Sequence, residues 1–179
     1  RLSASQGRVP DLIVKSTPWT QPAEGQDEWW QPEVESGLTE DRWIKAVEVR
    51  PSEKGRRIVH HGNSALAEFA VGKEGEIYPE GTGKLMKAGE KVRFDIHYHS
   101  VGEEITDQLE VGVWFYPKTY MPKYQVKSMA LGVFQAMDTF DLPPNKVTVH
   151  HGYATLTEPT KVLSYQPHMH MRGKAMSLE

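Results

Sequence analysis

The sequence predicts an all-β protein, built from short strands with Greek-key or jelly-roll packing. Two stretches carry this prediction, residues 91–100 and 109–115, because apolar and polar residues alternate in them as on a strand with one buried face. Elsewhere no capped stretch with an apolar stripe at 3.6-residue spacing indicates a helix of ordinary length. We therefore expect sheets to provide the core.

The first 40 residues are predicted to form an extended arm, since their polar sequence lacks periodicity and contains prolines throughout. Three tryptophans interrupt it: Trp19, Trp29 and Trp30. Side chains this apolar do not suit a free linker, so we expect them to anchor the arm on the body of the protein. The alternative is an aromatic binding surface.

Residues 41–120 are predicted to form a first β domain. Its expected strands are residues 43–50, 56–61, 65–71 (a strand or a short helical turn), 91–100 and 109–115. Within residues 91–100, one face is apolar, formed by Val92, Phe94, Ile96 and Tyr98. The opposite face is polar, formed by Arg93, Asp95, His97 and His99.

Pro117 and Pro122 mark a boundary, after which residues 121–179 are predicted to begin a second β domain. Strands are expected there at residues 124–133, 146–151 and 160–170.

Composition excludes several classes of function. A net charge of −3 over 179 residues provides no basic field for nucleic acid or an anionic membrane. No apolar run approaches the 18 residues of a membrane span. The absence of cysteine excludes disulfides, thiolate zinc sites and iron–sulfur clusters.

The histidines are the strongest chemical signal, because all eight occur in four close pairs: His60-His61, His97 with His99, His150-His151 and His168 with His170. Residues i and i+2 of a strand share a face, so His168 and His170 can hold one metal ion from one side. Adjacent histidines on a regular strand point apart, and they share an ion only at a strand end or through different ring nitrogens. Each pair has the alternative of a solvated strand face. Imidazoles with nearby Met169 and Met171 suit copper better than calcium, magnesium or structural zinc.

Three segments in order, residues 59–61, 96–99 and 167–174, resemble the copper type II, ascorbate-dependent monooxygenases, the family of peptidylglycine α-hydroxylating and dopamine β-monooxygenase. They read Val-His-His, Ile-His-Tyr-His and Pro-His-Met-His-Met-Arg-Gly-Lys. Residues 79–85 and 107–113 resemble the bacterial branch of this family.

The resemblance implies two jelly-roll-like β-sandwich domains, each with one copper, the second incomplete here. It implies that His60, His61 and His97 bind an electron-storing copper, with His97 preferred to His99 because it directly precedes the tyrosine. His168 and His170 would be catalytic, binding the copper that activates dioxygen to hydroxylate an activated C–H bond. His150 and His151 match no ligand of the family.

The resemblance further implies a reductant such as ascorbate or a cytochrome-type donor, a small-molecule or peptide substrate, and export to the periplasm or the extracellular space. The family's third ligand to the catalytic copper is a methionine further along the chain. Met169 and Met171 have the wrong strand parity, and Met176 lies about 20 Å beyond His170 on an extended strand. We therefore expect an incomplete oxygen-activating site.

Two alternatives remain open from the sequence. A cupin-type metal dioxygenase would use His97, His99 and Glu103 or Glu104 as ligands to a single ion. The other alternative is a copper-binding or structural β module without catalytic turnover.

Overall fold

The computed structural model describes residues 9–70, 72–73, 75–129, 141–169 and 172–179. The chain divides into two units, Arg1–Lys127 and Ser128–Glu179. Among the described residues, secondary structure consists of strands and one three-residue 3₁₀ helix, η1 (Gly55–Arg57). The predicted all-β fold is thus confirmed. No helix within these ranges is long and apolar enough to cross a membrane.

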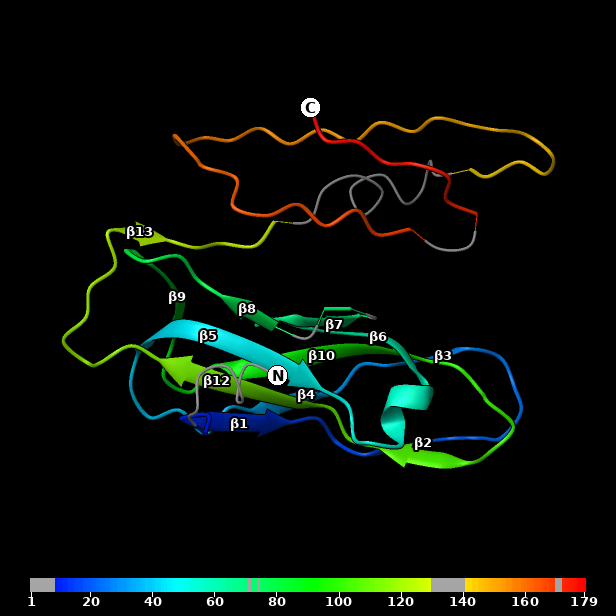
Figure 1. The fold of residues 1–179 in the computed structure, drawn as a ribbon, viewed down its shortest axis with the longest axis horizontal. Coiled ribbons are helices and arrows are strands. Elements are labelled where there is room, and N and C mark those ends of the chain that lie inside the picture. The colour runs from blue at the N-terminus through cyan, green and yellow to red at the C-terminus, as the bar shows by residue number, and fades with distance from the viewer. Residues whose placement is uncertain (1–8, 71, 74, 130–140, 170–171) are drawn as a thin grey trace. The chain divides into compact units, whose positions relative to one another are not determined.

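The larger sheet of the first unit is built around β5 (Arg42–Arg50), which the predicted strand 43–50 matches (Figure 1). One edge of β5 pairs with β12 (Glu110–Phe115), and the other edge pairs with β9 (Thr82–Met86) and β8 (Gly75–Ile77). Two outer strands complete this sheet: β1 (Leu12–Lys15) beside β12, and β13 (Tyr124–Gln125) parallel to β9.

The second sheet is built around β10 (Lys91–Tyr98), which lies within the predicted strand 91–100. One edge of β10 pairs with β6 (Val59–Ser64), which in turn pairs with β7 (Glu68–Ala70). Its other edge pairs with β3 (Glu28–Trp30) and β4 (Glu33–Glu35). A separate two-stranded ribbon joins β2 (Trp19–Gln21) to β11 (Ile105–Asp107).

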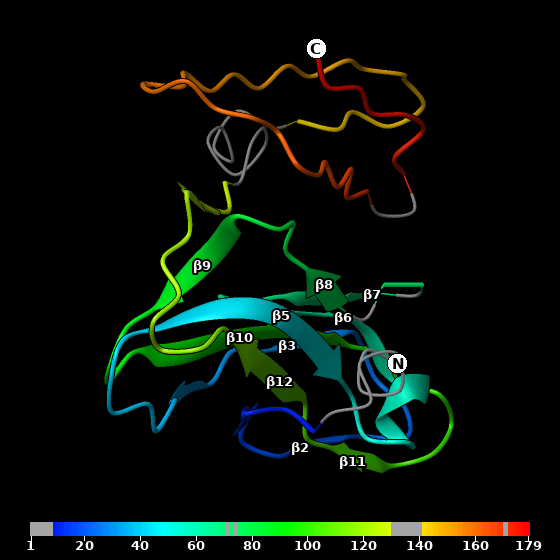
Figure 2. The same ribbon diagram turned by 60° about the vertical axis from the view of Figure 1, so that its left-hand side comes forward.

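The two large sheets of the first unit are shown as ribbons in Figures 1 and 2. Side chains from both sheets form one hydrophobic core. The predicted apolar face of β10 is buried, since the exposed fraction of Phe94, Ile96 and Tyr98 is 0%. From the larger sheet, β5 and β12 contribute valines that are equally buried: Val47, Val49, Val111 and Val113. The first unit is therefore β-sandwich-like, and the alternation in the sequence identifies its core face correctly.

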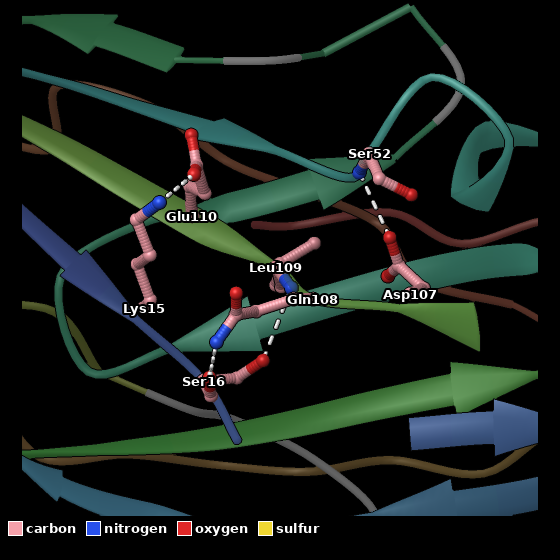
Figure 3. A network of polar contacts seen from close by, with 7 residues as sticks. All are labelled: Lys15, Ser16, Ser52, Asp107, Gln108, Leu109 and Glu110. Atoms are coloured by element: carbon pink, nitrogen blue, oxygen red, sulfur yellow. Dashed lines mark hydrogen bonds and ion pairs between the residues drawn. The ribbon is translucent and has the colours of Figure 1, made fainter. Parts of the chain in front are cut away.

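Buried polar contacts fix the segment that joins β11 to β12. The Asp107 carboxylate accepts hydrogen bonds from the Ser52 backbone N–H at 2.8 Å and the Tyr98 hydroxyl at 3.0 Å. Ser16 accepts one from the Leu109 N–H at its hydroxyl oxygen, 3.0 Å away (Figure 3). A Cβ on Gly55 would lie 1.9 Å from Asp107 Oδ1, so only glycine fits there. This network holds the end of β10, where the histidines lie.

The predicted N-terminal arm is incorporated into the sheets, because its described residues supply β1 to β4. Trp19 and Trp30 stack with ring centroids 4.9 Å apart and pack against the core, which confirms that these two anchor the segment. The prolines interrupt the strands without preventing pairing, because each strand is three or four residues long and lies at a sheet edge or in a ribbon.

The second unit differs from its prediction. Its described residues form neither strand nor helix, so the predicted strands at residues 146–151 and 160–170 do not form over the part that is described. The predicted strand 124–133 is reduced to β13, and residues 130–133 lie outside the described ranges. β-branched residues alone do not make a strand, because backbone groups in a strand need a neighbouring strand to pair with. Val147 and Val149 are 84% and 76% exposed.

Candidate metal centre

A β-bulge brings the first histidine pair together with β10. Along the β6–β10 ladder, His97 is opposite His61, but the next residue of β10, Tyr98, is opposite Val59. His60 is therefore an extra residue in β6. A bulge of this kind bends the strand locally and re-aims the side chain it carries. It resolves the difficulty that adjacent histidines on a regular strand point apart.

Three imidazole rings gather at this bulge. The ring centroid of His60 lies 5.0 Å from that of His97 and 5.4 Å from that of His61. The centroids of His61 and His97 are 5.2 Å apart. All three pairs are edge-on rather than stacked. The structure thus brings together the three histidines that the sequence assigned to one site.

The spacing of the rings suits a shared ion. Metal–nitrogen bonds of about 2 Å, opened at a tetrahedral angle, place imidazole centroids roughly 5 Å apart. As the side chains are oriented, no group of three or more histidines, cysteines or acids in the described part of the chain is arranged to hold a metal ion. The backbone therefore provides the ring spacing, and rotation of the His60 and His61 side chains is needed to direct their nitrogens toward the His97 ring. Three imidazoles without a thiolate form a donor set that copper accepts.

The site is buried on one side and open on the other. His97 and His61 are 3% and 7% exposed, whereas His60 is exposed. The prediction placed His97 on the polar face of its strand, together with Arg93 and Asp95, which are exposed and half-buried. The His97 ring itself is nonetheless buried. His60 therefore forms the rim of the cluster.

Two further side chains contact His97, and both come from the N-terminal segment. The Trp29 ring stacks on the His97 ring with centroids 4.0 Å apart and planes 12° from parallel. Asp27 Oδ2 lies 2.9 Å from His97 Nε2. Sequence reasoning did not include Asp27, because its proximity depends on β3 pairing with β10. Trp29 was predicted to anchor the N-terminal segment, with an aromatic binding surface as the alternative, but its stacking on His97 was not predicted.

The remaining predicted ligands lie elsewhere or outside the described residues. The ring of His99 is 6.4 Å from that of His60, farther than the three rings of the cluster are from one another. In the second unit His168 is exposed, and His170 lies outside the described residues. His150 is exposed and within 3.1 Å of the Thr148 hydroxyl, while the ring of His151 stacks with Tyr153 at 6.4 Å.

One of the two carboxylates proposed for a cupin-type site forms an ion pair away from the histidines. Glu103 pairs with Arg57, whose guanidinium lies 2.5 Å from Glu103 Oε2. The hydrogen bond and the charge of Arg57 lower the pKa of the Glu103 carboxyl. His97 faces His60 and His61 instead, so the arrangement favours an all-imidazole cluster over a set of two histidines and Glu103.

Comparison with known proteins adds no assignment, since no family model and no curated protein matches the chain.

Proposed function

We propose that the chain is a copper-dependent monooxygenase-like protein that hydroxylates an activated C–H bond with dioxygen. The observation that carries the proposal is the cluster of His60, His61 and His97, with ring centroids 5.0–5.4 Å apart. A sequence resemblance selected these three residues, and the bulge in β6 gives a physical reason why they can act together.

His60, His61 and His97 would hold the electron-storing copper. A copper ion bound by three imidazoles supplies one-electron redox chemistry, cycling between Cu(I) and Cu(II). The surrounding residues would control the access of water and of a reductant to this copper. Burial of His61 and His97 limits access of water to their rings. The exposed His60 edge leaves a side open to a reductant, for which ascorbate or a cytochrome-type donor is the proposal.

His168 and His170 would hold the second, oxygen-activating copper. This part of the proposal rests on the Pro-His-Met-His-Met-Arg-Gly-Lys sequence at residues 167–174. A small molecule or a peptide is the proposed substrate, and an exported, bacterial setting is the proposed location.

Copper stoichiometry and oxygen uptake test the proposal together. His61→Ala should remove about one copper equivalent per chain, because it deletes a buried ligand, whereas His151→Ala should remove none. The two variants lose the same chemical group from adjacent-histidine pairs, so His151→Ala is the matched control. Copper is measured by elemental analysis after dialysis, and oxygen consumption is followed with ascorbate and a candidate substrate.

Each of three other outcomes would contradict a specific part of this proposal. Unchanged copper in His61→Ala means that the cluster is not a copper site. Bound copper that ascorbate does not reduce to Cu(I), and that supports no oxygen uptake, supports a copper-binding module and contradicts the enzyme. One tightly bound iron or manganese ion in place of copper supports the cupin-type alternative.

A further inference from the structure

The contact between Asp27 and His97 constrains which ring nitrogen can bind a metal. Asp27 Oδ2 and His97 Nε2 are 2.9 Å apart, a hydrogen-bond distance. An ionised carboxylate can only accept a hydrogen bond. When Asp27 accepts this hydrogen bond, the proton lies on Nε2, and Nδ1 is then the ring nitrogen whose lone pair can bind a metal.

The register of the sheet makes this contact a built feature of the fold. β3 pairs antiparallel with β10 so that Trp29 is directly opposite His97. Asp27 immediately precedes β3, and its carboxylate contacts Nε2 of the His97 ring. On the other edge of β10, His61 is directly opposite His97. One edge thus supplies the acceptor for Nε2, and the other supplies the neighbouring imidazoles.

Trp29 restricts the ring in a second way. Its indole ring stacks on the imidazole ring, with centroids 4.0 Å apart and planes 12° from parallel. A ring stacked on one face and hydrogen-bonded at one nitrogen has little freedom to rotate about χ2. The burial of His97, which is 3% exposed, is consistent with a fixed orientation.

We propose that Asp27 is a positioning residue that holds His97 in the Nε2–H tautomer, with Trp29 fixing the plane of the ring, so that Nδ1 is the atom presented as a metal ligand. Carboxylates that accept the second N–H of a metal-binding histidine set its tautomer and raise its basicity as a ligand. The role of Nδ1 as a ligand rests on the proposed copper site. The tautomer does not, because the hydrogen bond forms within the chain itself.

The tautomer is tested in the metal-free protein. With ¹⁵N-labelled histidine, NMR should show that the His97 Nε2 proton is protected from exchange with solvent. The ¹⁵N chemical shifts of the ring should be those of the Nε2–H tautomer. Asp27→Ala should abolish the protection, because the acceptor is gone. Asp27→Asn should retain most of it, because the amide oxygen can still accept. Glu24→Ala, which removes the same charge from an exposed position in the same loop, should leave the signal unchanged.

Copper binding tests the consequence in the full chain. Asp27→Ala should weaken Cu(II) binding at the cluster by about 10–100-fold, and Asp27→Asn by less, while Glu24→Ala should have no effect. Trp29 provides a readout that is independent of turnover, since a paramagnetic ion on the ring beside it quenches its emission. Cu(II) should therefore quench a component of the fluorescence that Trp29→Phe lacks.

The outcomes separate this inference from the proposed function. A proton on Nδ1 of His97 in the metal-free protein overturns the inference, whatever copper does. Equal copper affinity in Asp27→Ala and the wild type overturns the positioning role. Identical quenching in the wild type and Trp29→Phe overturns the placement of the ion at His97. If the wild-type chain shows the Nε2–H tautomer but binds no copper, the tautomer assignment is supported and the proposed function fails.

Discussion

His60-His61 and His150-His151 are the same dipeptide in different surroundings. The first pair lies in β6, between two paired strands. A bulge there brings the ring centroids of His60, His61 and His97 to 5.0–5.4 Å from one another. The second pair lies in a segment that forms no strand in its described residues, and both of its side chains are exposed. The local sequence is identical, and only the neighbouring strand makes one pair a candidate site.

This difference extends to the units that contain the pairs. The first unit buries apolar side chains from both of its large sheets in a shared core. The described residues of the second unit leave valines, leucines and tyrosines exposed, among them Val147, Tyr153 and Val162. A metal site formed by imidazole rings needs ring positions fixed to within fractions of an ångström. Packed strands provide such positions, and an unpaired segment does not.

The largest expected effect concerns the core behind the cluster. Phe94→Ala should lower the free energy of unfolding by about 3–5 kcal/mol, because it empties a fully buried aromatic site in β10. Val147→Ala should change it by less than about 0.5 kcal/mol, because that side chain is 84% exposed. Urea unfolding is measured by tryptophan emission and by circular dichroism. All five tryptophans precede residue 115, so their emission reports on the first unit, whereas circular dichroism reports on the whole chain.

Comparable destabilisation by the two substitutions would contradict the contrast between the units, since Val147 would then contribute to a core.

The next expected effect concerns the bulge. Deleting His60 lets β6 and β10 pair continuously, and copper affinity at the cluster should fall more than about 100-fold because a ligand is lost and the His61 ring is re-aimed. Deleting His150 is the matched control and should leave this affinity unchanged. Competitive titration of Cu(I) with a chelator measures both. Retained affinity after deletion of His60 would show that the bulge does not build the site.

The smallest expected effect concerns two tyrosines and alkaline pH. Burial raises the pKa of Tyr78, with the Glu76 charge adding to the shift. The folded protein therefore keeps this proton above pH 10, where an unfolded tyrosine loses it, so stability is full below about pH 10 and falls by up to about 1.4 kcal/mol per pH unit above it. Tyr78→Phe should show a shallower loss between about pH 10 and 11.5.

Tyr153→Phe is the control, because Tyr153 is 81% exposed, and its unfolding should follow the wild type at every pH. Urea midpoints across this pH range measure the difference. Parallel loss in the wild type and Tyr78→Phe would contradict the prediction.

Parts of the fold could be predicted from local pattern. The strand 91–100 and its buried face were correct because alternation of apolar and polar residues depends only on the two-residue period of a strand. Strands in the first 40 residues were missed because each is three or four residues long, too short for a period to be visible. Strands predicted at residues 146–151 were wrong over the described residues because β-branched composition does not supply a pairing partner.

For the candidate site, the sequence by itself determined which residue types were available: eight histidines in four close pairs, no thiolate, and a tryptophan-rich N-terminal segment. The family resemblance grouped His60, His61 and His97. Only the tertiary structure decided which of the histidines meet. The bulge at His60 and the opposition of Trp29 and His97 arise from long-range pairing between strands. Strand register is fixed by the packing of a whole sheet face against the core, so no stretch of local sequence encodes it alone.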